Sequence, residues 1–419
     1  MAIQEPFQRK FDVIVWGASG FVGRLIAEHL FVTYGVNGTL RWAMAGRQAS
    51  KLESVRASLG PGADVIPIVI ADSHQKSTLE DMASSARVVC SAVGPYADYG
   101  SELIEVCIQA GTDYCDLSGE THWIRWMIDA HEAAAREHNV RIVNCCGLDS
   151  VPSDLGTLFV QNSMKARHGV YSPEVSMRLV NFKNAELSGG TYASILNAMA
   201  MVTTNRSVRK QMMDPNALMP EADNAEAPAT DVNLPRWEHE VGAWVAPFMM
   251  ATINSKVVRR SNALAGFPYG HDFRYGEGEA TGPGLKGWLL ALGKTLALTW
   301  FMLFTIIGPT RFILRRLLPS PGDGPDRETR ESGSYEILFT ARHPGDPAHT
   351  VQATVTGDRD PGYGSSSRMI GECAVCLALD DAPRSVPGGF WTPATCLGES
   401  LIKRLQSHAG IDFKIKDQA

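Results

Sequence analysis

The stretch Phe11-Asp-Val-Ile-Val-Trp-Gly17-Ala-Ser-Gly20-Phe-Val-Gly23 joins an apolar run to three glycines at fixed spacing. An apolar strand that enters a glycine turn and continues into a helix forms a site for a pyrophosphate. The first glycine permits the tight turn, the second lets the phosphates approach the backbone, and the third lets helix and strand pack closely. The predicted nucleotide-binding residues of this turn are Gly17, Ala18, Ser19, Gly20, Phe21, Val22 and Gly23.

Length and composition indicate a folded protein of two domains. Of its residues, 44% are hydrophobic and 20% charged, as in folded globular proteins. A chain of 419 residues is too long for a single core. A net charge of −6 gives no basic footprint, so we expect no nucleic-acid partner. The eight cysteines fall mostly in apolar runs, as buried thiols of a reducing compartment do. The first ten residues lack the apolar core of a secretion signal, so a cytoplasmic location is expected.

Strand-like and helix-like segments alternate up to about residue 150. After the first strand, further strands are expected at residues 40–47, 64–72, 86–96, 112–120 and 141–147. This alternation is typical of a doubly wound parallel sheet. We therefore predict an α/β fold whose residues 1–150 form a Rossmann-type nucleotide-binding domain.

The ends of the expected strands predict which cofactor binds. Arg47 closes the second strand, where an arginine accommodates the 2′-phosphate of NADP and an acid would hold the ribose of NAD. Asp72 closes the third strand, where it lies near the adenine or caps the next segment. Val93, Gly94 and Pro95 follow the fourth strand, on the nicotinamide side of the cleft. The predicted cofactor is NADP, as NADPH.

A set of motifs in fixed order resembles the saccharopine dehydrogenase-like oxidoreductases, a family that includes an animal lipid-droplet protein and mycobacterial trans-acting enoyl reductases. The motifs are the glycine turn, Ala45-Gly46-Arg47, Val93-Gly-Pro-Tyr96, Asp116-Leu-Ser-Gly-Glu120, Gly147-Leu-Asp-Ser-Val-Pro-Ser-Asp154, Val257-Val-Arg-Arg-Ser261, Val355-Thr-Gly357 and Gly388-Gly-Phe-Trp-Thr-Pro393. The resemblance implies a nucleotide-binding domain with a second α/β domain closing over it. It does not imply lysine metabolism.

The second domain, residues 151–419, is predicted to be α+β. We expect helices at residues 154–166 and 191–203 and a strand at 174–182. An antiparallel sheet is expected from strands at 257–263, 273–279, 335–342 and 350–356. Two further helices, at residues 364–379 and 393–408, lie within the segment 364–419, which could pack back on the first domain.

An apolar insert at residues 285–318 is the second informative feature. Lys294 is the only charge in about two dozen residues, close to the roughly 20 apolar residues that a spanning helix needs. Arg311, Arg315 and Arg316 then form a basic flank suited to anionic headgroups. Three structures are compatible with this segment. It could be a membrane span, or a buried core helix or oligomer interface, or a helix broken near Gly308-Pro309 that dips into one leaflet. The last alternative predicts peripheral membrane contact through residues 286–316, and the second leaves a homodimer open.

Candidates for the catalytic proton are weak. Tyr96, Tyr99, Asp116, Glu120 and Asp149 lie at strand ends that face the cleft, but each could also cap a turn or pack. No cysteine and histidine spacing suggests a metal. Two functions remain open. One is an NADP-dependent reductase of a hydrophobic acyl, enoyl or polyketide-type substrate at a membrane surface. The other is a lipid-associated nucleotide-binding protein without turnover.

Overall fold

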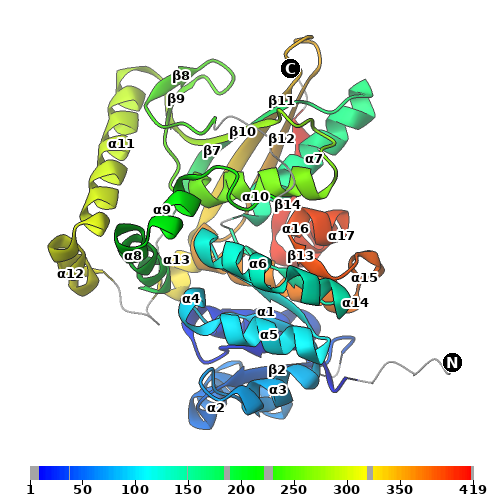
Figure 1. The fold of residues 1–419 in the computed structure, drawn as a ribbon. Coiled ribbons are helices and arrows are strands. Elements are labelled where there is room, and N and C mark those ends of the chain that lie inside the picture. The colour runs from blue at the N-terminus through cyan, green and yellow to red at the C-terminus, as the bar shows by residue number, and fades with distance from the viewer. Residues whose placement is uncertain are drawn as a thin grey trace.

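The computed structural model describes residues 9–36, 38–148, 150–183, 189–220, 230–318 and 324–416. Two seven-stranded sheets organise it, one above the other (Figure 1). The first sheet has the strand order β13-β6-β5-β4-β1-β2-β3, and all its pairs are parallel. This confirms the predicted Rossmann-type sheet. Its strands are β1 (Phe11–Trp16), β2 (Trp42–Gly46), β3 (Ile68–Ile70), β4 (Ala86–Ser91), β5 (Asp113–Asp116), β6 (Arg141–Val143) and β13 (Gly389–Trp391).

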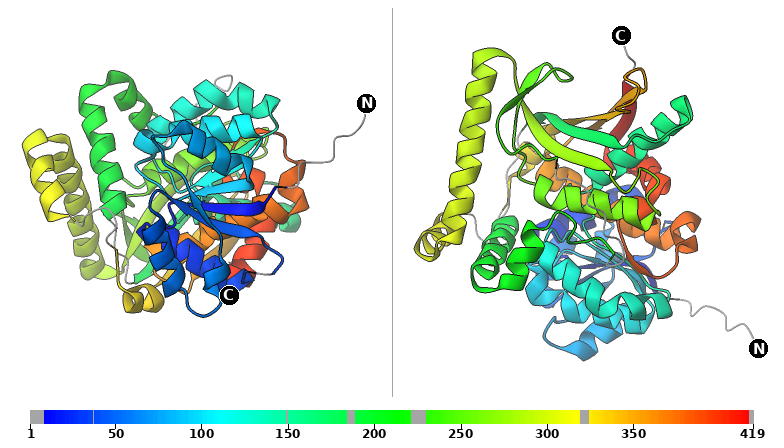
Figure 2. Two further views of the ribbon diagram at one scale, coloured as in Figure 1. Left: turned by 90° about the horizontal axis from the view of Figure 1, so that it is seen from below. Right: turned by 45° about the horizontal axis from the view of Figure 1, so that its top comes forward.

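Helices cover both faces of this sheet, so its central strands are almost entirely buried. Every residue of β1 and β2 is buried, which explains why these strands are continuous apolar runs without alternation. The helices are α1 (Phe21–Tyr34), α2 (Ala49–Ser58), α3 (Lys76–Ser84), α4 (Tyr96–Tyr99), α5 (Ser101–Ala110), α6 (Thr121–Glu137) and α14 (Ser366–Leu379). Figure 2 shows this layering from below (left) and with the top of the molecule tilted forward (right).

Two elements of the N-terminal sheet layer come from the far end of the chain. Strand β13 pairs with β6, with Phe390 opposite Ile142, and adds a seventh strand that the sequence did not reveal. Helix α14 packs against α1, β1, β4 and β5. Both elements belong to the last sixty residues, so the C-terminal segment packs on the first domain.

The second sheet is mixed, with the order β14-β12-β11-β7-β10-β9-β8. The expected antiparallel sheet is wrong in the pairing of β10, which runs parallel to β7. The long crossover through α8, α9 and α10 between them makes a parallel pairing possible. The strands are β7 (Glu174–Lys183), β8 (Arg236–Glu238), β9 (Ala243–Ala246), β10 (Arg274–Gly282), β11 (Ser334–Arg342), β12 (Thr350–Gly357) and β14 (Ile411–Lys416).

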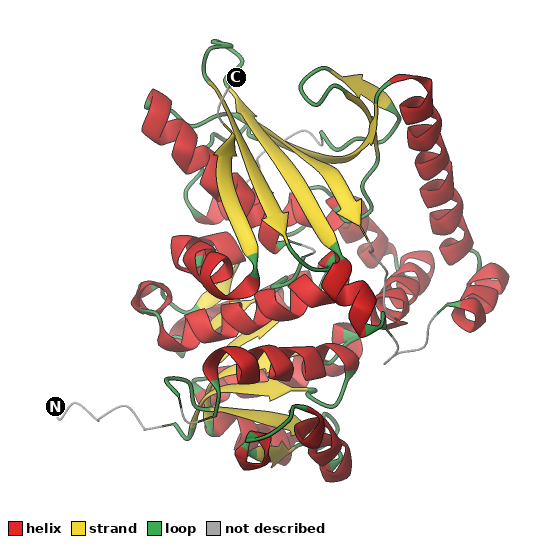
Figure 3. Ribbon diagram, turned by 180° about the vertical axis from the view of Figure 1, so that it is seen from behind, coloured by secondary structure: helices red, strands yellow, loops and turns green. Residues whose placement is uncertain are grey.

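Helices α7 (Val151–His168) and α10 (Ala251–Leu264) cover one face of the second sheet. Figure 3 views the molecule from behind, and there the strands of the second sheet lie in front of the helices. Strand β12 alternates half-buried and buried residues accordingly, as expected for a sheet with one covered face.

The predicted strand at residues 257–263 is wrong, because these residues lie in helix α10. The helix is buried on nearly all sides, so its sequence lacks the polar face that marks a surface helix. Even Arg260 is enclosed, and its guanidinium donates hydrogen bonds to the carbonyls of Leu218, at 2.6 Å, and Phe390, at 2.7 Å. A short run with two valines cannot be separated from a strand by periodicity alone.

The C-terminal part also differs from its predicted single helix at residues 393–408. It consists of α16 (Pro393–Cys396), α17 (Gly398–Arg404) and a π-helical turn at Leu405–Ala409. Gly398, with φ of 47°, separates the first two pieces.

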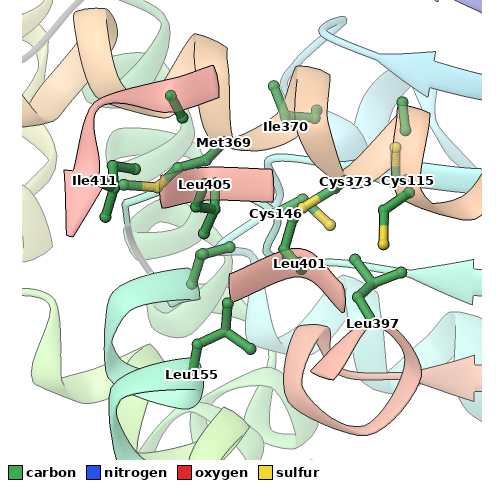
Figure 4. Close-up of a cluster of buried hydrophobic side chains, with 14 of the residues drawn as sticks. Cys115, Cys146, Leu155, Met369, Ile370, Cys373, Leu397, Leu401, Leu405 and Ile411 are labelled. Carbon is green, nitrogen blue, oxygen red and sulfur yellow. The ribbon is translucent and has the colours of Figure 1, made fainter. Parts of the chain in front are cut away.

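A continuous core joins the two sheets (Figure 4). It contains side chains of the first sheet, of α7, of α14 and of the C-terminal helices, among them Cys115, Cys146, Leu155, Cys373 and Leu401. All eight cysteines are free and buried. This confirms that they serve as core thiols, and the two cysteines of the Cys373-Ala-Val-Cys376 segment lie on the buried helix α14.

The remaining helices lie between and beside the sheets. They are α8 (Gly189–Thr204), α9 (Arg206–Met213), α11 (Gly284–Ile306), α12 (Gly308–Leu317), α13 (Arg327–Ser332) and α15 (Asp381–Ser385). In Figure 1 the helix α11 forms a long arm along one side of the molecule, near β9 at one end and α8 and α12 at the other.

Candidate nucleotide-binding site

The glycine turn has the geometry that its spacing predicts. Gly17 has a φ of 87°, and a Cβ there would lie 2.6 Å from Cγ2 of Val93. Gly23 lies in the first turn of α1, where a Cβ would come within 2.1 Å of the Gly17 carbonyl oxygen. The first position therefore requires a left-handed backbone, and the third requires a side chain no larger than hydrogen.

Gly20 sits between these two positions and is exposed. The nearest atom to a Cβ built on it is the Gly17 carbonyl oxygen, at 3.3 Å, so the space above it is open. Gly20 is also the N-cap of α1, and no described side chain caps the N–H groups of the first helical turn. These groups and the helix dipole face the open space, as a bound pyrophosphate requires.

Arg47 directly follows β2 and is exposed, at the same edge of the sheet as the glycine turn. Ser19 lies beside Gly46, the residue before Arg47, because the Ser19 Oγ is 3.5 Å from the place of a Cβ on Gly46. Within the described part of the chain, Arg47 forms no ion pair or side-chain hydrogen bond. A guanidinium and a hydroxyl together suit a ribose 2′-phosphate.

Asp72 follows β3 and is half-buried. Its carboxylate accepts a hydrogen bond from the backbone N–H of His74, at 3.0 Å, and its own N–H donates to Thr78 Oγ1 at 2.9 Å. The side chain thus closes a turn before α3. Contact with an adenine remains a prediction.

The turn after β4 is organised by Glu120. Its carboxylate accepts hydrogen bonds from the backbone N–H groups of Tyr96, at 2.8 Å, and Ala97, at 3.0 Å. It also accepts one from Ser194 Oγ of α8, at 3.1 Å. Burial raises the pKa of Glu120. Because three donors converge on one carboxylate, Glu120 fixes the Val93-Gly-Pro-Tyr96 turn relative to the second domain.

Tyr96 points its hydroxyl into the interior. The hydroxyl donates to the Ser91 carbonyl, at 3.1 Å, and accepts from the Leu117 N–H, at 3.2 Å. Burial, with the nearby Asp116 carboxyl, holds the pKa of the Tyr96 hydroxyl well above its usual value. In this geometry Tyr96 ties the end of β4 to the end of β5, and a role as proton donor remains a prediction.

Asp116 is fully enclosed at the end of β5. It accepts hydrogen bonds from the Ser118 N–H, the Tyr114 hydroxyl and the Asn144 amide, at 3.0, 3.0 and 2.8 Å. Burial raises the pKa of Asp116 to about 7. The carboxyl therefore joins β5 to the loop after β6.

Two other candidates from the sequence are placed differently. Tyr99 is half-buried beside the ring of His74, with centroids 6.0 Å apart. Asp149 lies outside the described residues. In the described ranges, no group of three or more histidine, cysteine or acidic side chains is arranged to hold a metal ion.

The second domain contributes residues that the sequence analysis missed. The ring of Tyr363 packs edge-on against Phe21 of the nucleotide turn, with centroids 5.3 Å apart. The Tyr363 hydroxyl lies 3.3 Å from Thr191 Oγ1 of α8, one turn before Ser194. The only sequence signal was Gly189-Gly190 at the start of a predicted helix, which is compatible with close packing but not specific.

Comparisons with known proteins agree with this geometry. Residues 13–143 match the family model described as the saccharopine dehydrogenase NADP binding domain. A Mycobacterium tuberculosis protein named as a trans-acting enoyl reductase is 36% identical over 416 residues, with 97% of both chains covered. The chain belongs to the saccharopine dehydrogenase-like oxidoreductase family. It is an oxidoreductase with an NADP-binding domain.

Two further relatives extend over the whole chain. The trans-acting enoyl reductase of Mycobacterium leprae is 35% identical over 425 residues, covering 97% of this chain and 98% of that protein. The Mycobacterium bovis (BCG) trans-acting enoyl reductase is 35% identical over 420 residues, covering 96% of each. A solved structure, apo saccharopine dehydrogenase (L-Glu forming) from Saccharomyces cerevisiae, is 15% identical with a TM-score of 0.49, covering 97% of this chain and 99% of that one.

Substituting Gly20→Val should weaken NADPH binding. The valine side chain would occupy the open space at the helix N-terminus and displace the pyrophosphate from N–H groups. Loss of one or two hydrogen bonds to a charged group, each about 1.5–3 kcal/mol, raises the Kd by about tenfold to several hundredfold or more. NADPH fluorescence titration measures this. Gly293→Val is the control, because Gly293 also has open space around it but lies in α11. Equal Kd values for the two variants would contradict the assignment.

Substituting Arg47→Asp should change the cofactor preference. The carboxylate would repel the 2′-phosphate of NADPH, so we expect the Kd for NADPH to rise by about a hundredfold, while the Kd for NADH changes little. Lys51→Asp makes the same charge change on an exposed position of α2 and serves as the control. If both variants weaken NADPH equally, the effect is one of net charge, and Arg47 does not contact the phosphate.

Proposed function

We propose that the chain reduces the carbon–carbon double bond of an enoyl group carried on a hydrophobic acyl or polyketide-type lipid at a membrane surface. The observation that carries the proposal is the joint position of two features. The nucleotide turn is open at Gly20 and is connected to Thr191 of α8 through Phe21 and Tyr363, and α8 packs against an exposed apolar helix, α11. The names of the full-length relatives support enoyl reduction.

Bound NADPH would supply the hydride of such a reduction. The chain would orient the nicotinamide half through the turn that Glu120 holds after β4. Phe21 and Tyr363 pack over the start of α1 and would exclude water from the cofactor. Reduction also consumes a proton. Glu120, whose pKa burial raises and which contacts Ser194 of α8, is the candidate acid nearest the second domain.

One observation also supports the alternative function, a nucleotide-binding protein without turnover. The proton-donating groups Tyr96, Asp116 and Glu120 all make hydrogen bonds within the protein. A lipid-associated nucleotide-binding protein without turnover would have the same arrangement. The reductase and this alternative differ in a single measurable property, namely consumption of NADPH.

The apolar insert is the basis for the membrane part of the proposal. Only α11 among the described helices is long and apolar enough to cross a membrane, and 17% of its most apolar window is buried. Of the three alternatives for this segment, a helix buried in the core of a single chain therefore does not fit. Trp300 is 55% exposed and Leu296 50%, and similar side chains continue along α11 and α12. Such a surface is unfavourable in water and requires a cover.

A single crossing of a bilayer is incompatible with the sheet. Strand β10 precedes α11, strand β11 follows α12, and both strands pair with β7. Both ends of the insert are therefore held on the same side. Helix α12 has ten residues, about half of what a return crossing needs. The break at Ile307–Gly308 instead favours a bent pair of helices lying in one leaflet.

Charges on the insert suit an interfacial position. Lys294, the cation in the middle of α11, is paired with Glu279 of β10. Arg315 and Arg316 are exposed on α12, and Arg315 donates to Asn197 Oδ1 of α8 at 2.9 Å. Each such cation near an anionic surface adds about 1 kcal/mol of attraction.

A turnover assay tests the proposed reaction. We expect NADPH absorbance to fall when the protein is mixed with an enoyl thioester in the presence of liposomes. Mass spectrometry with deuterated NADPH should find the label on the saturated product. With NADPH held near its wild-type Kd, Gly20→Val should lower both signals, because it weakens NADPH binding. NADPH binding without oxidation or product, across short-chain and long-chain enoyl and keto lipids, would favour the alternative without turnover.

Flotation with liposomes tests the membrane contact. The double substitution Leu296→Asp and Trp300→Asp places two charges on the exposed face of α11 and should reduce binding to anionic vesicles at least tenfold, because charged groups enter hydrocarbon at a cost of about 2.5–3.5 kcal/mol each. Val32→Asp introduces a charge at an exposed valine of α1 and is the control. A different result would assign this face to a second copy of the chain. In that case neither protein floats with liposomes, the wild type sediments as a dimer, and the double variant sediments as a monomer.

A further inference from the structure

A groove of about 440 Å³ runs under α11, between the helix and the segment that contains Asn233 and Pro247. Its helical wall is the face of α11 formed by Thr295, Leu298 and Met302 with their neighbours one turn along. This volume is within the range of small-molecule sites. The lining includes Leu303 and Ile306, which are partly exposed, so the groove adjoins the exposed apolar face of α11.

The lining offers a ligand almost no hydrogen bonds. Thr295 Oγ donates to the Ala291 carbonyl at 2.7 Å, and Thr299 Oγ donates to the Thr295 carbonyl at 2.8 Å. Both hydroxyls are therefore already hydrogen-bonded within the helix. The Asn233 amide donates to the Asp231 carbonyl at 3.2 Å. None of the described residues that line the groove is charged. The site therefore favours a flexible apolar chain over a polar ligand.

A series of contacts through α8 connects α11 with the turn after β4. Phe301, next to Met302, packs edge-on against Tyr192 of α8 with ring centroids 6.4 Å apart. Two residues further along α8, Ser194 donates to Glu120 at the turn after β4. Helix α8 therefore contacts the groove wall through one residue and the candidate reaction site through another.

We propose that this groove binds the hydrocarbon chain of the substrate, with the enoyl end directed along α8 toward the turn held by Glu120. The inference rests on the proposed reductase function. The exposed apolar face of α11 would remain in contact with lipid while the groove holds the chain. The groove is open along one side and lined by apolar side chains, which suits an extended hydrocarbon chain laid along α11.

Chain-length dependence tests this proposal. Leu298→Trp would fill the groove with an indole ring, whereas Leu296→Trp makes the same substitution about 200° around the helix, on the exposed face. NADPH oxidation is measured with crotonyl-CoA and with hexadecenoyl-CoA, in the presence of liposomes. We expect Leu298→Trp to lower kcat/KM for the long substrate about tenfold, equivalent to about two methylene groups that are no longer buried. The short substrate should react as with the wild type, and Leu296→Trp should leave both substrates unchanged.

A direct binding measurement separates failure of the groove from failure of the reaction. The fluorescent fatty acid parinaric acid is titrated into each protein without NADPH. Weaker binding to Leu298→Trp, with unchanged binding to Leu296→Trp, supports the groove even if no protein oxidises NADPH. Equal loss of activity for both chain lengths, or unchanged binding and activity in Leu298→Trp, overturns the proposal. A change of oligomeric state in Leu298→Trp alone would assign the groove to a second copy.

Discussion

A buried carboxylate holds the nucleotide-binding helix in place. Glu372 of α14 is fully enclosed and accepts hydrogen bonds from the Tyr34 hydroxyl of α1, at 2.7 and 2.8 Å, and lies 2.8 Å from His29 Nε2. Arg404 of α17 approaches the same carboxylate at 3.5 Å and pairs with Asp380. An enclosed carboxylate that lost one of these partners would cost several kcal/mol, so the three elements are fixed together. The position of the glycine turn at the other end of α1 depends on this arrangement.

This constraint explains why the two domains behave as one structure. Helix α14 belongs to the end of the chain, yet twelve of its fourteen residues are buried between the first sheet and the C-terminal helices. The first domain cannot cover β1 and β4 without it. The nucleotide turn is also covered from the second domain, by Tyr363 against Phe21. Cofactor binding is therefore coupled to the packing of segments more than 300 residues apart in the chain.

The sequence predicted local features that depend on local physics. The three glycines, the apolar strands and the break at Gly308-Pro309 follow from backbone geometry and periodicity, and the structure has each of them. It failed where tertiary contacts decide the outcome. The run Val257–Ala263 carries strand-forming residues, but burial on all sides makes it a helix. Strand β13 has three residues and gains its stability from pairing with β6, which no local pattern reveals.

The candidate site shows the same division. Gly17, Gly20 and Gly23 were identified because their roles are steric and need no partner from elsewhere. The carboxylates of Asp116 and Glu120 were identified as acids at strand ends, but their donors lie on other elements: Asn144 for the first, and Ser194 of α8 for the second. Glu120 thus has two structural roles, and the sequence did not predict that one residue has both. It orients the turn beside the cofactor, and it joins that turn to the helix that packs on the apolar arm. A ligand that moved α8 would therefore act on the turn after β4 through the hydrogen bond from Ser194 to Glu120, and on the glycine turn through Thr191 and Tyr363, whose ring packs on Phe21.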